Sequence, residues 1–207
     1  MKLVMFSPRE RELDRGWPGR LDGDRVIQLA AQTVESFLTG GGTAREHDEF
    51  PLAEVVLRAP VLRPLSIRLF SDARTFVFGN TASIFGPDAV VPWPTGAQWV
   101  EARWCVGAVV GAEGGIGGFT LVNDWRCDLP PPKDADFGFT LGPWIATAGE
   151  YEPAFAWSDA LEHAARNTHL RAGEVLVSPP LHAQRVSRDD EVSLEHGELG
   201  TLRSIVV

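Results

Sequence analysis

Two side chains in the second half of the chain have the types and spacing of a site that handles acids. Asp124 follows an apolar run, Gly117–Asn123, and precedes a proline-rich stretch, so we expect it at the end of a strand. A carboxylate there can bind a metal ion or orient a substrate, although an Asn-Asp pair before a loop is also ordinary turn chemistry. Lys133, the only lysine besides Lys2, follows in the expected loop, which runs on to Trp144. Its ammonium could neutralise a substrate carboxylate or enolate, shuttle a proton, or be solvated.

The elements that must position these residues are mostly strands. The chain has 21 Gly and 15 Pro, and the stretches between them are short, which favours strands and loops over long helices. We expect a hairpin turn at 17–24, helices at 27–38 and 158–167, and Ser158 as the N-cap of the second helix. The expected strands are 1–6, 25–29, 97–111, 118–123, 175–177 and 202–207.

The segment Ala59–Pro64 has two prolines and is typical of a boundary between units. We therefore expect a small N-terminal domain at 1–60 and a main domain at 61–207. The fold class is α+β and mostly β.

Composition and charge narrow the function classes. The formal net charge is −9, whereas nucleic-acid proteins usually present a basic face. Apolar stretches end well before the ~20 residues that a membrane-spanning helix needs, and no secretory signal is recognisable, so we expect a cytoplasmic protein. The two cysteines, Cys105 and Cys127, are too few for a disulfide scaffold and fit buried free thiols.

Asp124 and Lys133 belong to longer sequence motifs. Gly118–Trp125, with Lys133 nine residues before the segment Gly142–Thr147, resembles the signature of the fumarylacetoacetate hydrolase family. Three other segments are also similar to that family: Ala53–Pro64, Leu170–Leu176 and Gly200–Arg203. The last two resemble the family's final pair of strands. The resemblance therefore covers nearly the whole chain.

The resemblance implies a small N-terminal α/β unit followed by a mixed β-roll, usually dimeric, that uses Mg²⁺ or a similar divalent ion. Members of the family hydrolyse, decarboxylate or tautomerise 2-oxo and 1,3-dicarbonyl acids. By position, Asp124 matches a metal ligand and Lys133 matches the lysine that holds and polarises the bound acid. A chelated divalent cation would stabilise the enolate formed when a C–C bond breaks.

The sequence departs from the family at the metal site. When residues 108–111 are aligned with the Val-Val-Ile-Gly-like end of the family's strand, Arg103 and Cys105 align with the two glutamates that bind the metal in the family. A guanidinium cannot bind a cation, and a neutral thiol is a poor ligand for Mg²⁺. Glu101 shares their strand face by period-two alternation, so a two-residue slip could supply one carboxylate. We therefore expect weak or absent Mg²⁺ binding, with Asp124 and Glu101 as candidate ligands.

Parts of the substrate site are altered as well. The interval 65–85, where the family carries a histidine-bearing lid, holds no histidine. Ser178 begins a Ser-Pro-Pro segment where a Thr-Gly-Thr-type loop would bind a substrate carboxylate, and the prolines remove two amide donors. The candidate substrate contacts are Ser178, His182, Arg103 and Trp125, whose ring could equally pack in the core.

Three functions stay open. The first is an enzyme acting on a small oxo acid through Asp124 and Lys133, with its metal site altered. The second is a non-catalytic relative in which Arg103 pairs with Asp124 in a buried ion pair or binds a carboxylated ligand. The third is metal-free catalysis in which Arg103 and Lys133 stabilise an enolate. In each, the partner is a small carboxylic acid, and exposed sheet edges favour a homodimer.

Overall fold

The computed structural model describes residues 1–11 and 13–207 of the chain. These residues form 16 strands, two α-helices and three short 3₁₀-helices, so the protein is mostly β, as the sequence predicts. Among the described residues, no helix is both long and apolar enough to cross a membrane.

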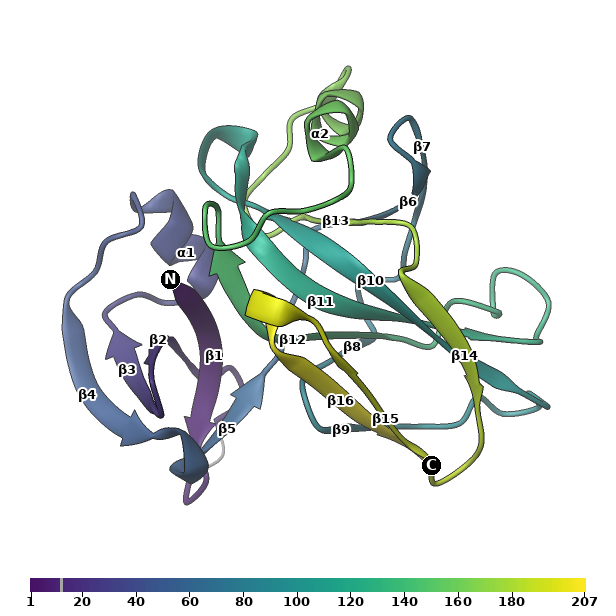
Figure 1. The fold of residues 1–207 in the computed structure, drawn as a ribbon, viewed down its shortest axis with the longest axis horizontal. Coiled ribbons are helices and arrows are strands. Elements are labelled where there is room, and N and C mark those ends of the chain that lie inside the picture. The colour runs from purple at the N-terminus through teal and green to yellow at the C-terminus, as the bar shows by residue number, and fades with distance from the viewer. Residues whose placement is uncertain (12) are drawn as a thin grey trace.

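An antiparallel group of strands and one short helix form the N-terminal part of the molecule (Figure 1). The phenyl ring of Phe6 lies in its core with Trp17 and Phe50, at centroid distances of 6.1 and 5.4 Å. The elements are β1 (Lys2–Pro8), β2 (Trp17–Asp22), β3 (Arg25–Leu29), α1 (Val34–Thr39), β4 (Glu46–Pro51), η1 (Leu52–Glu54) and β5 (Val55–Arg58).

The N-terminal strands continue into the main sheet because β1 pairs antiparallel with β12 (Phe139–Thr147). The sheet then runs through β11 (Ile116–Cys127) and β10 (Val100–Val110) to β13 (Val175–Val177), β6 (Ile67–Asp72) and β7 (Thr75–Phe78). Two further strands, β14 (His182–Val186) and β8 (Ile84–Phe85), pair with β10 and β12. The predicted division at residue 60 stays a prediction.

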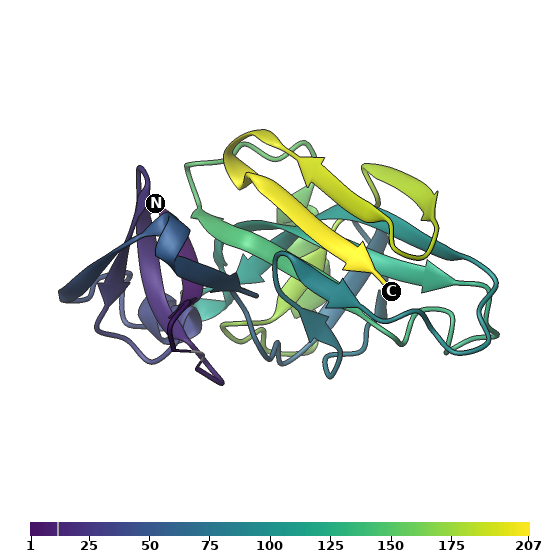
Figure 2. The ribbon, with the colours of Figure 1, turned by 90° about the horizontal axis from the view of Figure 1, so that it is seen from below.

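A second, three-stranded sheet lies against one side of the main sheet, and two of its strands are the yellow ones in Figure 2. Its strands are β15 (Glu191–Glu195), β16 (Thr201–Val206) and β9 (Ala89–Val91), and η3 (Gly197–Leu199) connects β15 to β16. A hydrogen bond from Ser204 Oγ to Thr140 Oγ1, 3.3 Å, joins the two sheets inside the core. The helix α2 (Trp157–Ala165) and the short η2 (Ala112–Gly114) complete the fold.

The two long strands β10 and β11 separate two apolar cores. Trp104, Val106 and Trp125 belong to the core beneath the second sheet and α2. Cys105 and Val122 belong to the other core, which includes Leu3 and Met5 of β1. Since neighbouring residues of a strand point to opposite faces, the two cores lie on opposite sides of the main sheet.

Gly118 in β11 marks a place where backbones approach too closely for a side chain. A Cβ at this position would lie 2.4 Å from the carbonyl oxygen of Ala146 and 2.5 Å from Cγ2 of Ile145. We expect Gly118→Ala to lower the free energy of unfolding by about 2 kcal/mol, measured by urea denaturation. Gly115→Ala is the matched control, since a Cβ there meets only the carbonyl oxygen of Ala112 at 3.5 Å. Equal stability of the two variants would contradict this account of the contact.

Several local predictions need correction. The segment 17–22 is the strand β2, so the turn is confined to the Gly23 region and the hairpin joins β2 to β3. The first helix is only Val34–Thr39, because 27–29 pairs with β2 and β4 in a sheet. The second helix has Ala156 as its N-cap, with no side-chain cap, and not Ser158. The expected final strand pair is also wrong, because β13 and β16 belong to different sheets.

Candidate functional site

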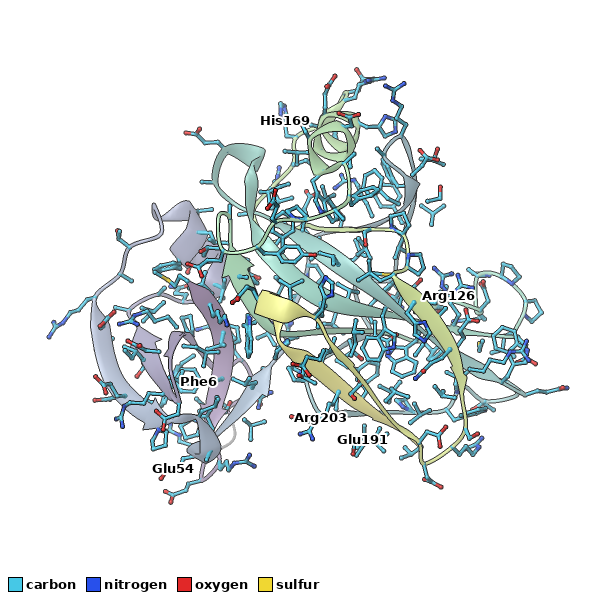
Figure 3. The ribbon with its side chains drawn as sticks, in the orientation of Figure 1. Phe6, Glu54, Arg126, His169, Glu191 and Arg203 are labelled. Carbon is cyan, nitrogen blue, oxygen red and sulfur yellow. The ribbon has the colours of Figure 1, made fainter. Side chains whose placement is uncertain are left out.

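Four charged side chains of alternating sign lie on one face of the main sheet, near the end of β10 and β11. Glu101 and Arg103 come from β10, and Asp124 and Arg126 come from β11. In the antiparallel register, Glu101 faces Arg126 and Arg103 faces Asp124, so opposite charges meet across the strands as well as along them. We call these four residues the charged cluster. Figure 3 shows Arg126 at the end of the molecule away from the N-terminal sheet that holds Phe6.

Asp124 is held by Arg126. The Nε of Arg126 donates to both carboxylate oxygens of Asp124, at 3.1 and 2.9 Å, and its Nη2 lies 2.9 Å from Oδ2. The side chains are 5% and 17% exposed, so this is a largely buried pair. Asp134, from the loop between β11 and β12, approaches Nη1 of Arg126 at 3.8 Å. Both oxygens of Asp124 are therefore already used by a guanidinium.

Of the two arginines, Arg103 has the more exposed side chain. Its Nε donates to Oε1 of Glu101, and its side chain is 38% exposed. No hydrogen bond joins its two Nη atoms to any described residue. The expected ion pair between Arg103 and Asp124 is thus corrected: the two residues face each other in register, but Asp124 takes Arg126 as its partner.

The strand in which Asp124 lies is longer than expected. It runs to Cys127, so Asp124 is inside the strand and not at its end. Likewise, residues 139–144 of the expected loop belong to the strand β12. Pairing on both sides with β10 and β12 is what buries this carboxylate.

Burial raises the pKa of two groups on this face of the sheet, the Asp124 carboxyl and the Cys105 thiol. Desolvation raises the pKa of the Asp124 carboxyl, and the positive charges of Arg126 and Arg103 oppose that rise only in part. Burial also raises the pKa of the Cys105 thiol far above its ordinary value, and the neighbouring charge of Asp124 adds to the effect. Cys105 is therefore a neutral thiol at pH 7, which makes it a weak nucleophile and a weak metal ligand.

Both cysteines should consequently be inert in the folded protein. Cys105 and Cys127 are free thiols, 1% and 3% exposed, and burial raises the pKa of each. We expect Ellman's reagent to titrate neither thiol in buffer at pH 8 and both in guanidinium chloride. Rapid release of one equivalent from the folded protein would show that one of these sites is open to solvent.

The residues at this position do not fit a resident Mg²⁺ or similar ion. Both oxygens of Asp124 accept hydrogen bonds from Arg126, Glu101 accepts one from Arg103, and Cys105 is neutral. A divalent cation there would lie beside two guanidinium charges, and the carboxylates that could offset them are already paired with those guanidinium groups. In the described part of the chain, no group of three or more His, Cys, Asp or Glu residues is arranged to hold a metal ion.

Lys133 is paired with a carboxylate outside the charged cluster. Its ammonium pairs with Asp136 and its side chain is 69% exposed, and Asp136 also accepts a hydrogen bond from Asn80 at 3.0 Å. The loop itself is attached to the end of β11, since the backbone N–H of Cys127 donates to the carbonyl of Asp134 at 2.9 Å. The structure thus places Lys133 on the loop next to the cluster but joins its side chain to a different carboxylate.

The other expected contacts lie on the opposite face of the sheet. Trp125 is fully buried in the core, and its Nε1 donates to Thr140 Oγ1 at 2.9 Å, so no face of the ring is open to a substrate. His182 is exposed and lies opposite Trp104 in the register. Ser178 is buried; its Oγ accepts from the backbone N–H of Val106 and donates to the carbonyl of Pro179. Trp125, His182 and Ser178 therefore do not lie beside Arg103 and Asp124.

The sequence reasoning missed Arg126 and Asp134. Arg126 follows Asp124 by two residues and so had to share its face, which the alternation of a strand could have indicated. The pattern Glu101-x-Arg103 on one strand and Asp124-x-Arg126 on the next, in opposite chain directions, predicts a checkerboard of charges once the strands pair in this register. Asp134 approaches the cluster from a loop, and no periodic pattern in the sequence could have indicated its position.

Comparison with known proteins identifies the fold but no close relative. No family model and no curated protein matches the sequence. Among the solved structures that match are three that cover all of this chain and nearly all of their own. Maleylpyruvate hydrolase from Sphingobium sp. SYK-6, in complex with manganese(II) ion and pyruvate, has a TM-score of 0.78 at 18% identity, covering 100% of this chain and 99% of that one.

Two isomerases have the same architecture. The 5-carboxymethyl-2-hydroxymuconate delta-isomerase from Mycobacterium smegmatis has a TM-score of 0.79 at 20% identity, covering 100% and 99% of the two chains. The 2-hydroxyhepta-2,4-diene-1,7-dioate isomerase from Mycobacterium marinum has a TM-score of 0.78 at 20% identity, covering 100% and 98%. All three are members of one enzyme family. Over its whole length, this chain has the fold of the fumarylacetoacetate hydrolase family.

Proposed function

We propose that this protein binds a small 2-oxo or 1,3-dicarbonyl acid through Arg103, and that it does so without a divalent metal ion. The observation that supports this most directly is the open end of Arg103. Its Nε is engaged by Glu101, whereas its Nη atoms have no hydrogen bond to the described residues and the side chain is 38% exposed. A guanidinium edge with free N–H donors matches the planar fork of a carboxylate.

The fold supports the same class of ligand. One protein of this fold was solved with manganese(II) and pyruvate, a 2-oxo acid, and others are, by name, isomerases of unsaturated acids with two or three carboxylates. In the present chain, the altered metal site is part of the proposal: the charge of Arg103 takes the role that a divalent ion has elsewhere. Glu101 and Asp124 then act as positioning residues that fix the two arginines.

A second candidate function is turnover of that acid by hydrolysis, decarboxylation or tautomerisation. It is favoured by the attachment of the Lys133 loop to the cluster through Asp134, which lies 3.8 Å from Arg126. Lys133 would have to leave Asp136 and stabilise an enolate together with Arg103. If it does not, the protein is a binding member of this fold.

Calorimetric titration with oxalate and pyruvate, in buffer containing EDTA, tests the proposal. We expect saturable binding that added Mg²⁺ or Mn²⁺ does not strengthen, and a loss of at least about tenfold in affinity in Arg103→Gln. Arg25→Gln is the matched control, because Arg25 makes the same Nε contact with a glutamate, Glu49 at 2.8 Å, far away on β3. Binding that requires a divalent ion, or that survives Arg103→Gln, would contradict the proposal.

Turnover is tested separately with acetylpyruvate, a 1,3-dicarbonyl acid whose enol absorbance disappears when it reacts. Metal-free loss of absorbance that Lys133→Met abolishes would support the catalytic function. If the protein binds oxalate but turns over no dicarbonyl acid, the catalytic function is contradicted and the binding function alone is supported.

We also infer the setting of this function: a cytoplasmic homodimer that contacts neither nucleic acid nor membrane. The net charge of −9 supports the exclusion of nucleic acid. The strand β7, at one edge of the main sheet, exposes 60% of Val77 and 69% of Phe78, which favours a covering partner. Light scattering coupled to gel filtration would give twice the chain mass of 22.6 kDa if the inference is correct.

A further inference from the structure

A third guanidinium, that of Arg185 in β14, faces the same side of the main sheet as the charged cluster. β14 lies alongside β10 (Figure 1), and their antiparallel register sets Arg185 opposite Glu101 and Ala183 opposite Arg103. Residues that are directly opposite in register point to the same face of a sheet. Val186, the next residue of β14, is buried in the core on the other face, as the alternation requires. Arg185 therefore extends the row of charges onto a third strand.

Arg185 is positioned by an aromatic ring. The Cζ atom of its guanidinium lies 4.5 Å from the centroid of the Trp99 ring. Trp99 is fixed in turn, because Oδ1 of Asp128, just after β11, accepts hydrogen bonds from the backbone N–H groups of Gln98 and Trp99 at 2.8 and 3.5 Å. No hydrogen bond or ion pair joins the side chain of Arg185 to any described residue. A guanidinium stacked on a ring in this way keeps the N–H donors at its edge free for a ligand.

The two guanidinium groups with free donors, those of Arg103 and Arg185, belong to diagonal neighbours on adjacent strands. Diagonal neighbours in an antiparallel pair are about 7–8 Å apart, which is within the reach of long side chains. The other two corners of this square are Glu101, which accepts a hydrogen bond from Arg103, and the exposed Ala183. Since Ala183 has only a methyl group, a small ligand can approach both guanidinium groups from its side.

The charges on this face leave Arg185 without a carboxylate. Glu101 and Asp124 each accept hydrogen bonds from an arginine of the charged cluster. Asp134, from the loop after β11, approaches Arg126 at 3.8 Å. Arg185 has no such partner among the described residues. A ligand carboxylate placed there would form charge-assisted hydrogen bonds that the protein itself does not supply.

We propose that the site prefers oxo acids with a second carboxylate, and that Arg185 binds this second carboxylate while Arg103 binds the first. This inference rests on the proposed function, because it names the class of acid that the same site selects. Arg185 then determines specificity, and Trp99 is a positioning residue that acts through Arg185.

Two five-carbon 2-oxo acids test the proposal by calorimetric titration of the full chain in buffer containing EDTA. 2-Oxoglutarate ends in a second carboxylate, whereas 2-oxopentanoate ends in a methyl group. We expect 2-oxoglutarate to bind about fivefold more tightly or better. This ratio of dissociation constants should fall between about 0.05 M and about 0.5 M NaCl, because Arg185 is exposed and salt screens exposed charges.

Substitutions at Arg185 should change this ratio. Arg185→Gln should reduce it to less than about twofold, and Arg185→Lys should give a ratio between those of Arg185→Gln and the unmodified protein, since it keeps the charge but loses the planar fork. Trp99→Leu should also lower the ratio, because Arg185 loses the ring that holds it.

Arg188→Gln is the matched control. Arg188 has the same kind of ring contact, with Trp93 at 4.9 Å, but it lies at the second sheet, where the next residue, Asp189, donates its backbone N–H to the carbonyl of Val206. This variant removes the same charge from the chain and should keep the ratio of the unmodified protein.

The outcomes separate this proposal from the proposed function. Equal dissociation constants for the two acids in the unmodified protein, or a ratio that Arg185→Gln leaves unchanged, overturn the role of Arg185 but not the binding of oxo acids by Arg103. If Arg188→Gln lowers the ratio as far as Arg185→Gln does, the preference reflects overall charge and the role of Arg185 is overturned. If neither acid binds, or if both bind Arg103→Gln as well as the unmodified protein, the proposed function is contradicted and this proposal with it.

Discussion

Asp124→Asn is expected to lower the free energy of unfolding by about 3 kcal/mol, as measured by urea denaturation at pH 7. The substitution keeps the shape of the side chain but leaves the buried guanidinium of Arg126 without its carboxylate. The loss falls at the lower end of the range for broken buried pairs because Arg126 is 17% exposed and keeps Asp134 at 3.8 Å.

Two comparisons make this result specific. Asp88→Asn removes the carboxylate of an exposed pair, in which Asp88 and Arg203 are 63% and 53% exposed, and should change stability by less than about 0.5 kcal/mol. The double variant Asp124→Leu/Arg126→Met removes both buried charges and should regain most of the lost stability, because the desolvation of two ions is relieved. If Asp124→Asn is no less stable than Asp88→Asn, the pair does not hold the two long strands together.

The second large effect is expected from Arg103→Glu combined with Cys105→Glu. The variant should gain Mn²⁺ binding with a Kd of about 0.1 mM or tighter, measured from the electron paramagnetic resonance signal of free Mn²⁺. Residues 103 and 105 share the sheet face of Asp124, and 103 lies directly opposite Asp124 in register. Three carboxylates would then converge, while Arg126 has Glu101 directly opposite as an alternative partner.

The matched control for this gain is Arg103→Gln/Cys105→Ser, which removes the same two side chains without adding carboxylates and should bind no Mn²⁺. Mn²⁺ should raise the Tm of the glutamate variant and leave that of the control unchanged. Equal affinity of the unmodified protein and the glutamate variant for Mn²⁺ would falsify the idea that a guanidinium has replaced a metal ion here.

Much of the architecture followed from short-range patterns. Frequent Gly and Pro limited element length, so the dominance of strands could be predicted, and apolar runs located β10, β11 and β13. The boundaries were less accurate where pairing extended a strand. Residues 124–127 include two charged side chains and carry no apolar run, yet they continue β11 because β10 pairs with all four of them and β12 pairs with Asp124.

For the site, the sequence by itself determined which side chains share a face of one strand, since alternation with period two is a local property. It placed Glu101, Arg103 and Cys105 together, and it marked Asp124 and Lys133 as unusual. The tertiary structure decided the ion-pair partners. The strand register places Arg103 opposite Asp124, but Asp124 pairs with Arg126, and Lys133 pairs with Asp136. It also put Ser178 and Trp125 on the far side of the sheet. Register and packing depend on residues distant in the chain, so no local pattern encodes them.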